Sequence, residues 1–260
     1  MEGLTGMTTG LSSDLWLLAD WPAPAQIHAG TSWRRGGISQ GPYASLNLAL
    51  HVGDDANAVA ENRRRLHLPS EPLWLNQVHG QTVVDAGPLL EQGSGQVSEA
   101  DAAYTDRVGV ICAVLTADCL PVLLCDRQGT RVAAVHAGWR GLAAGIIECT
   151  VDALNLPGDK LLAWLGPAIG PNAYEVGEEV RHAFVRENPD AGTAFRPSRA
   201  GHWWMDMYQL APQRLTSRGV SAISGGDHCT WHEADNFYSY RRDGVTGRMA
   251  TVIWIETNQA

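Results

Sequence analysis

Two apolar runs flank a tight polar turn, and this arrangement constrains the fold more than any other feature of the sequence. The runs PVLLCD and RVAAVHA stand on either side of the turn DRQGT (126–130), which predicts an antiparallel hairpin. A pairing centred between Gln128 and Gly129 places Cys119 across from the vicinity of His136. A thiol and an imidazole therefore meet at the open end of the hairpin, where each strand joins a loop.

The other patterns mix strands and helices without a regular βαβ alternation, so we expect an α+β fold with mixed sheets flanked by helices. Apolar runs and helical spacing predict strands over 72–79, 82–86, 108–116, 160–165 and 247–256, and helices over 54–66, 141–156, 177–187 and 206–217. The segment 87–99 is typical of a surface loop. No repeat or linker is evident, and we expect one domain over residues 1–260.

Charge and cysteine content limit the classes of function. The net charge of −9 argues against a nucleic-acid surface, which needs a basic stripe to neutralise phosphates. No run of about 18 apolar residues occurs, and Met1 to Asp20 lacks the features of a secretory signal. The five cysteines include no CxxC pair, which favours reduced thiols over disulfides. We therefore expect a cytoplasmic protein that contacts neither nucleic acid nor membrane; the sequence identifies no protein partner.

His79 ends an apolar run at a glycine in NQVHG (76–80), and it completes a set of one thiol and two imidazoles with Cys119 and His136. Zinc prefers these donors, and their wide separation in the sequence is unlike a zinc finger. Three protein ligands leave one position for water or substrate, which is the pattern of catalytic zinc. The alternative stays open that Cys119 is a small buried hydrophobe and that both histidines are ordinary hydrogen-bonded groups.

Two neighbours of this set carry charge. Asp118 is a candidate general acid or base, although a carboxylate at such a position is more often a loop cap. Arg140 precedes a predicted helix and is a candidate for holding an anion at the helix N-terminus; the alternative is a surface arginine. No GxGxxG, GxxxxGK[ST], HExxH or GxSxG motif is present, so dinucleotide, P-loop, zincin and α/β-hydrolase interpretations lack local support.

Several blocks of sequence, in the same order, resemble the YfiH family, which is also called the polyphenol-oxidase laccase or DUF152 family and includes a human laccase-domain protein. The blocks are RRGGISQGPYASLNLALHVGDD (34–55), NQVHG (76–80), TADCLPVLL (116–124), HAGWRG (136–141), GPAIGPNAYEVG (166–177) and FYSYRRDGVTGRMA (237–250). The resemblance runs from about residue 27 to 255. Two positions depart from the family pattern, since Trp33 stands where Thr is usual and Ala173 where Cys is common.

This resemblance implies a fold, a metal and an activity. The fold is a four-layer α/β/β/α arrangement shared with cytotoxic necrotizing factor toxins, which use a Cys-His pair. The implied zinc ligands are His79, Cys119 and His136. The implied activity is that of a purine nucleoside phosphorylase, which splits adenosine, inosine, guanosine or S-methyl-5'-thioadenosine with phosphate. Adenosine deamination is a second activity that the resemblance implies.

The two activities place different demands on the site. For phosphorolysis, we expect Arg34, Arg140 or Arg242 to position phosphate through charge-assisted hydrogen bonds. For deamination, zinc would activate water, and Asp118 is the nearest candidate in the sequence for moving its proton. Purine nucleoside and phosphate are thus the expected partners of the site.

Three alternatives stay open or are disfavoured. A cysteine hydrolase or amidase acting on a cell-wall precursor would use Cys119 as nucleophile and His136 or His79 as base. A copper-dependent polyphenol oxidase is disfavoured, because a multicopper enzyme needs His-x-His pairs and the nine histidines include none. A structural zinc module needs a fourth protein ligand, for which Cys229 and His228 are the candidates.

Overall fold

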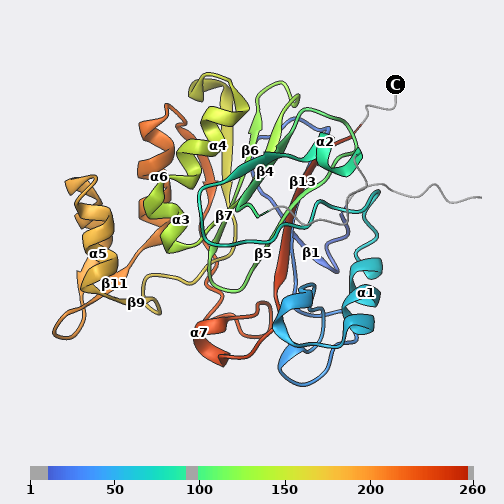
Figure 1. Cartoon of the computed structure of the whole chain (residues 1–260), viewed down its shortest axis with the longest axis horizontal. Coiled ribbons are helices and arrows are strands. Elements are labelled where there is room, and N and C mark those ends of the chain that lie inside the picture. The colour runs from blue at the N-terminus through green and yellow to red at the C-terminus, as the bar shows by residue number, and fades with distance from the viewer. Residues whose placement is uncertain (1–10, 92–98, 257–260) are drawn as a thin grey trace, which may run out of the picture.

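The computed structural model describes residues 11–91 and 99–256 of the chain (Figure 1). The predicted hairpin is present, because β6 (Leu120–Asp126) and β7 (Val132–Ala137) pair antiparallel with Pro121 opposite His136. Every residue of both strands is buried, in keeping with their continuous apolar sequence. The predicted register is confirmed, and it places Cys119 immediately before β6.

The hairpin lies in the middle of a six-stranded sheet. In spatial order its strands are β12 (Ala222–Gly225), β8 (Leu161–Leu165), β6, β7, β4 (Ala102–Thr105) and β3 (Val83–Asp85). The outer pairs β12–β8 and β4–β3 are parallel, whereas β8–β6, β6–β7 and β7–β4 are antiparallel. This mixed sheet confirms the expected α+β class and differs from a doubly wound parallel sheet.

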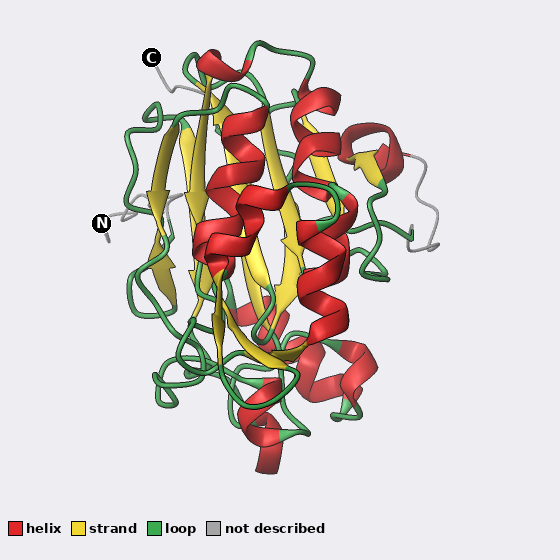
Figure 2. Cartoon of the chain, turned by 90° about the vertical axis from the view of Figure 1, so that its left-hand side faces the viewer, coloured by secondary structure: helices red, strands yellow, loops and turns green. Residues whose placement is uncertain are grey.

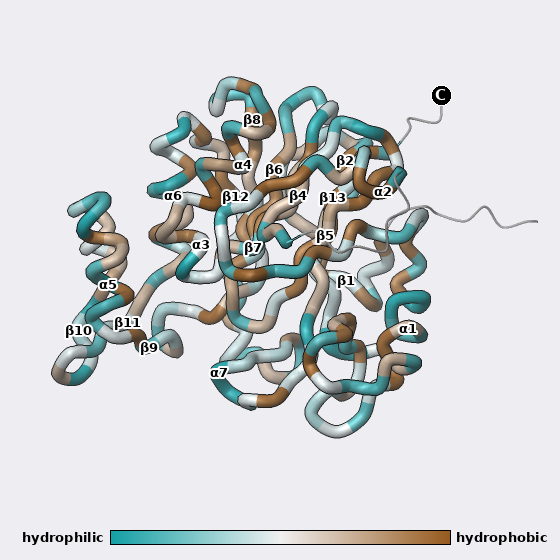
Figure 3. Tube along the Cα trace, viewed as in Figure 1, coloured by the Kyte–Doolittle hydropathy of each residue, from teal (hydrophilic) through white to brown (hydrophobic). Residues whose placement is uncertain are grey.

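A second sheet, antiparallel throughout, packs against one face of the first. In spatial order its strands are β1 (Trp16–Leu18), β2 (Ile27–Ser32), β13 (Met249–Ile255) and β5 (Cys112–Thr116). Alternate residues of β13 face opposite ways: Ile253 joins the core between the sheets, whereas Val252 and Trp254 join the core on the outer face. Figure 3 shows hydrophobic stretches running through these central strands.

Helices cover the other face of the six-stranded sheet (Figure 2). They are α3 (Trp139–Ala144), α4 (Ile146–Leu154) and α6 (Met207–Ser217). The outer face of the four-stranded sheet is covered by the chain around α1 (Ala56–Arg65), through Leu46, Leu48 and Leu66. The order of helix, sheet, sheet and helix confirms the four-layer α/β/β/α arrangement.

The remaining elements lie beside these layers. They are α2 (Ala86–Glu91), α5 (Glu178–Val185), α7 (Tyr240–Asp243), the small sheet β10 (Phe195–Pro197), β11 (His202–Met205) and β9 (Glu175–Gly177), and the 3-10 helices η1 (Gly41–Tyr43), η2 (Leu50–Val52), η3 (Gly158–Lys160) and η4 (Pro189–Ala194). Within residues 11–91 and 99–256, every helix is too short or too polar to traverse a bilayer.

Two predicted segments N-terminal to the hairpin differ in the structure. Residues 72–79 form isolated β-bridges at Leu73 and Asn76 instead of a strand. The apolar pattern reflects burial of Leu73 and Leu75 in the core between the sheets, and an extended segment can bury them without the continuous hydrogen bonds of a strand. The loop expected over 87–99 is in part helix α2, since Leu89 and Leu90 pack against the same core. Residues 92–98 of that loop lie outside the described residues.

Glycines account for two further differences. The helix predicted over 141–156 begins at Trp139 and is divided into α3 and α4 at Gly145, whose φ of +101° lies in the left-handed region. The strand predicted over 108–116 begins only at Cys112, because Gly109 has a φ of +77°. The helix expected over 54–66 is confirmed as α1, which the side chain of Asp55 caps.

Candidate functional site: a His–Cys–His cluster

Three side chains converge at the open end of the hairpin. The donor atoms of His79, Cys119 and His136 all lie within 4.8 Å of one another. Cys119 Sγ is 3.9 Å from His79 Nε2, and the two imidazole rings meet edge to face with 4.8 Å between centroids. Cys119 precedes β6, His136 lies in β7, and His79 comes from the loop before β3. The structure therefore brings together all three residues that the sequence singled out.

Asp101, which the sequence analysis missed, holds this cluster in place. Its buried carboxylate lies 2.8 Å from His136 Nδ1 and accepts hydrogen bonds from the backbone N–H groups of Val78, His79 and Gly80 at 3.2, 2.9 and 2.6 Å. Because Nδ1 of His136 faces the carboxylate, Nε2 is the nitrogen left for the cluster, as in carboxylate–histidine–metal arrangements. In the sequence, Asp101 is only an acidic residue before a short apolar run, and this pattern does not indicate a particular function.

Glycine residues leave the space that the cluster occupies. A Cβ atom at Gly138 would lie 2.8 Å from a ring carbon of His79 and 3.1 Å from Cys119 Sγ. A Cβ atom at Gly141 would lie 2.7 Å from the carbonyl oxygen of Gly80, so α3 and the loop that carries His79 pack backbone to backbone. His79 itself has a φ of +60°, which a residue other than glycine rarely adopts. The local packing thus keeps a small space among the three donors.

The electrostatics of the cluster favour a charged pair. Burial alone would raise the pKa of the Cys119 thiol, but His136, with help from His79, lowers it to about 6. Burial alone would lower the pKa of His136, but Cys119 and Asp101 raise it to about 9. Both shifts favour a thiolate beside an imidazolium. The thiolate is the form of cysteine that binds metals and attacks electrophiles.

The donor set fits a tetrahedral metal ion. Donors about 2.0 to 2.3 Å from zinc lie roughly 3.5 Å apart in a tetrahedron, close to the sulfur–nitrogen distance of 3.9 Å between Cys119 and His79. Within the described part of the chain, no other group of three His, Cys, Asp or Glu side chains is close enough to share an ion. Cys229 and His228 contact Gly170 and Glu233 instead, so they do not close the site.

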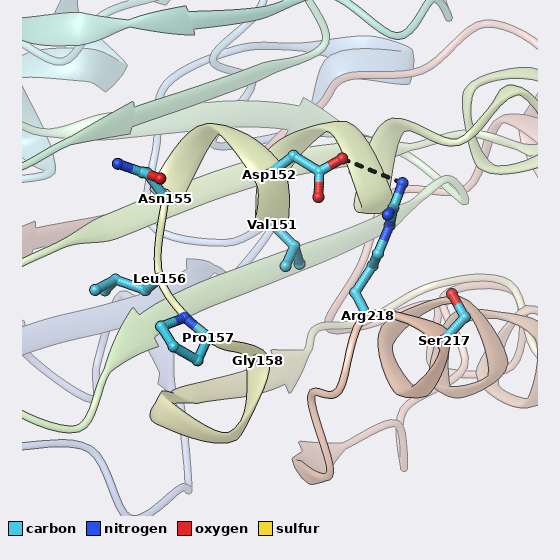
Figure 4. Close-up of a pocket in the computed structure, with 8 residues that line it drawn as sticks. All are labelled: Val151, Asp152, Asn155, Leu156, Pro157, Gly158, Ser217 and Arg218. Carbon is cyan, nitrogen blue, oxygen red and sulfur yellow. Dashed lines mark ion pairs between the residues drawn. The ribbon is translucent and has the colours of Figure 1, made fainter.

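The cluster lines a cavity of about 340 Å³. Five polar or charged side chains line it as well, namely His51, Gln77, Thr116, Tyr240 and Arg248. A larger cavity of about 530 Å³ lies between the end of α4 and the end of α6 (Figure 4). Its lining carries an ion pair of 3.1 Å between Asp152 and Arg218 but no cysteine or histidine, so the smaller cavity is the better candidate for chemistry.

Asp118 lies beside Cys119 in the chain, but both of its carboxylate oxygens accept hydrogen bonds from other residues of the protein. Its Oδ1 accepts a hydrogen bond from the hydroxyl of Thr230, and its Oδ2 accepts one from the backbone N–H of Arg241, each at 2.6 Å. Asp118 has a φ of +93° and does not line the cavity. The structure therefore shows it tying the start of β6 to helix α7.

The three predicted phosphate ligands also lie outside the cavity lining. Arg34 donates all its guanidinium nitrogens to two backbone carbonyl oxygens. Arg242 donates to three backbone carbonyl oxygens and to the carboxylate of Asp243. Arg140 stacks on Trp139 at 4.3 Å and lines a separate cavity together with residues of α3, α4 and α6. None of the three is brought to the His–Cys–His cluster.

Comparison with known proteins places the chain in a family. A family model described as multi-copper polyphenol oxidoreductase laccase matches residues 28–256. The chain belongs to this family. A purine nucleoside phosphorylase of Pseudomonas aeruginosa is 55% identical over 244 residues, which cover 93% of this chain and 98% of that protein. Purine nucleoside phosphorylase YfiH of Escherichia coli is 51% identical over 244 residues, with coverages of 92% and 98%.

Solved structures agree with this family membership. A Neisseria meningitidis protein of the DUF152 family matches with a TM-score of 0.89 and 48% identity, over 93% of this chain and 99% of that chain. YlmD from Geobacillus stearothermophilus matches with a TM-score of 0.87 and 33% identity, over 95% of this chain and 98% of that chain. These similarities confirm the expected YfiH and DUF152 relationship and its fold.

Proposed function

We propose that this protein is a zinc-dependent purine nucleoside phosphorylase. It converts adenosine, inosine, guanosine or S-methyl-5'-thioadenosine, with phosphate, into the free base and the ribose 1-phosphate. One observation carries the proposal: a three-donor metal site opens into a cavity that also contains a cationic side chain, Arg248. The names of the Pseudomonas aeruginosa and Escherichia coli relatives support the same reaction.

His79, Cys119 and His136 would hold the zinc ion. One thiolate and two imidazoles suit zinc, and Gly138 leaves open a space beside all three residues that an added side chain would fill. When bound, zinc would supply a Lewis acid that stabilises negative charge on the phosphate or on the departing base. Asp101 fixes the orientation of His136 through Nδ1, and the cavity volume falls within the range of small-molecule sites, which is about 300 to 1,000 Å³.

Adenosine deamination would use the same cavity with water in place of phosphate. The proposed proton shuttle, Asp118, directs both carboxylate oxygens at internal donors, so this activity would need another group to move the proton. Phosphorolysis has no such requirement at Asp118, and for that reason we place deamination second.

A cysteine hydrolase is a second candidate that a specific observation favours. Cys119, His136 and Asp101 form the series of thiol, imidazole and carboxylate that activates a nucleophile. Metal binding separates the two candidates, because a thiolate that serves as a zinc ligand is a poor nucleophile towards an amide. Removal of zinc should abolish phosphorolysis, whereas it should preserve or increase hydrolysis of an amide such as a cell-wall precursor peptide.

The decisive experiment incubates purified protein of measured zinc content with adenosine, with and without phosphate. Adenine that forms only with phosphate is the expected result, and inosine would instead indicate deamination. If neither product forms, the purine proposal is wrong. Cys119→Ala should lose both zinc and turnover, whereas the matched variant Cys149→Ala, a free cysteine of helix α4, should retain both.

A further inference from the structure

Arg248 is placed at the metal cavity by the second sheet. Strand β13 pairs with β5 so that Met249 lies opposite Thr116, and continuation of this register places Arg248 beside Ala117, two residues before Cys119. Both Ala117 and Arg248 line the cavity. The backbone of Arg248 is fixed on both sides, because its N–H donates to Asn47 Oδ1 and its carbonyl oxygen accepts from the N–H of Leu48.

The guanidinium group of Arg248 donates hydrogen bonds through one nitrogen and lies over the ring of Tyr240, 5.8 Å from its centroid. Nη1 donates to the carbonyl oxygens of Thr246 and Gly247, at 2.9 and 3.0 Å. Nε and Nη2 have no acceptor among residues 11–91 and 99–256, in contrast to the same nitrogens of Arg34 and Arg242. The Nε–Nη2 edge of arginine matches two oxygens of a phosphate in a bidentate pair. Arg248 thus lines the cavity and has a guanidinium edge without an acceptor in the described part of the chain.

Two other lining residues have polar side-chain atoms without a protein partner in the described part of the chain. His51, on η2, is exposed and has no hydrogen-bond partner among the described residues; partial desolvation, followed by the charges of Arg248 and Arg63, lowers its pKa. The lowered pKa favours the neutral imidazole, which can donate one N–H to an anion. Thr116 is 1% exposed, and its buried hydroxyl is without a partner in the same part of the chain. A buried polar atom in this state usually indicates a missing ligand or water.

We propose that Arg248, through Nε and Nη2, and His51 form the phosphate subsite of this cavity. The inference rests on the proposed phosphorylase function and deepens it, because it assigns the anion to residues that the sequence analysis did not name. Phosphate held there lies in the same cavity as the zinc ligands, and the nucleoside occupies the space between the subsite and the cluster. Arg34 and Arg242 donate to acceptors within the protein, and Arg140 lines a different cavity.

The test measures binding of inorganic phosphate directly, by titration calorimetry on the full-length protein with its zinc content recorded. Arg248→Gln should weaken phosphate binding about 10- to 100-fold, since it removes a charge-assisted bidentate pair. Arg248→Lys keeps the charge and the hydrogen bonds to carbonyl oxygens but loses the paired Nε and Nη2 donors, so its phosphate affinity should be intermediate. His51→Ala, which removes a side chain without a partner in the described chain, should weaken binding several-fold. Arg64→Gln is the matched control, because the side chain of Arg64 is 75% exposed on α1.

Zinc content and thermal unfolding show whether each variant is folded. Equal phosphate affinity in the wild type and in folded Arg248→Lys and His51→Ala would overturn the subsite, as would a wild type that does not bind phosphate. The adenosine assay separates this failure from failure of the proposed function. If the wild type cleaves adenosine but the KM for phosphate is the same in Arg248→Lys and His51→Ala, only the subsite is wrong. If the wild type binds phosphate through Arg248 but does not cleave nucleosides, only the phosphorylase function is wrong.

Discussion

Replacement of Asp101 by asparagine tests whether this carboxylate organises the metal cluster. Four N–H donors converge on its two oxygens: Oδ1 faces His136 Nδ1 and the backbone N–H of His79, and Oδ2 faces the backbone N–H groups of Val78 and Gly80. Asparagine offers one oxygen and one NH₂ group, so two of the four donors would face another donor in either orientation.

The structure allows the size of this effect to be worked out. Two lost hydrogen bonds to a buried charged group cost about 1.5 to 3 kcal/mol each, so Asp101→Asn should lower the free energy of unfolding by about 3 kcal/mol or more. Because His136 and the loop carrying His79 lose their support together, zinc affinity should fall about 10- to 100-fold, the usual effect of removing the carboxylate behind a histidine ligand. Denaturant unfolding and competition with a chromophoric zinc chelator measure the two quantities.

The pH dependence of stability provides a second measurement on the same variant. Burial alone would raise the pKa of Asp101, but hydrogen bonds from His136 and Gly80 lower it below its ordinary value. A carboxyl group with a lowered folded-state pKa stabilises the protein fully above its unfolded pKa, and this contribution is lost as the pH falls through the folded value. The difference between wild type and Asp101→Asn should therefore shrink below about pH 4. Zinc affinity and stability of Asp101→Asn equal to those of the exposed control Asp106→Asn would refute the reasoning.

Three further substitutions test separate parts of the structure. Gly138→Ala should reduce the zinc bound per chain under chelator competition by at least about tenfold, because the added methyl group would lie 2.8 Å from the ring of His79. The control Gly192→Ala, whose added methyl group would lie 3.8 Å from its nearest neighbour, should leave zinc binding unchanged. Asp118→Asn should lower the free energy of unfolding by about 1 to 3 kcal/mol and change kcat for adenosine by less than tenfold; a larger loss of kcat would show that Asp118 moves a proton. Leu123→Ala, at a fully buried position between the sheets, should cost about 2 to 5 kcal/mol in denaturant unfolding.

The pairing of Cys119 with His136 was predictable because it is set by local sequence. Five residues of turn fix where the two apolar runs begin to pair, and each further pair follows from the alternation of hydrogen bonds along the ladder. The same reasoning gave the central strands and the longer helices, whose periodicity comes from burying one face. Local sequence was insufficient at Gly145, where a left-handed residue divides a continuous helical pattern into α3 and α4.

The rest of the site depends on contacts between distant segments. His79 reaches the cluster because Asp101, 22 residues later, binds its backbone N–H. Its position at the end of an apolar run made His79 a candidate, but the resemblance to a family was the main reason to expect it in the cluster. The arginines could not be ranked for a different reason. Arg34 and Arg248 have the same side chain, and they differ in how many guanidinium nitrogens already donate to backbone carbonyl oxygens. That occupancy is a property of tertiary structure.

The family description names a multi-copper laccase, and the geometry of the site bears on that chemistry. Multicopper oxidases pass electrons from a mononuclear copper to a trinuclear cluster that requires several His-x-His pairs, and this sequence has none. Among the described residues, the side chains able to share an ion form a single group of three. Such a group would hold one metal ion, beside a cavity that Arg248 also lines. A single metal position beside a cationic side chain therefore suits the proposed transfer of a ribosyl group to phosphate, whereas reduction of dioxygen by a multicopper enzyme needs a trinuclear cluster for which this sequence lacks the His-x-His pairs.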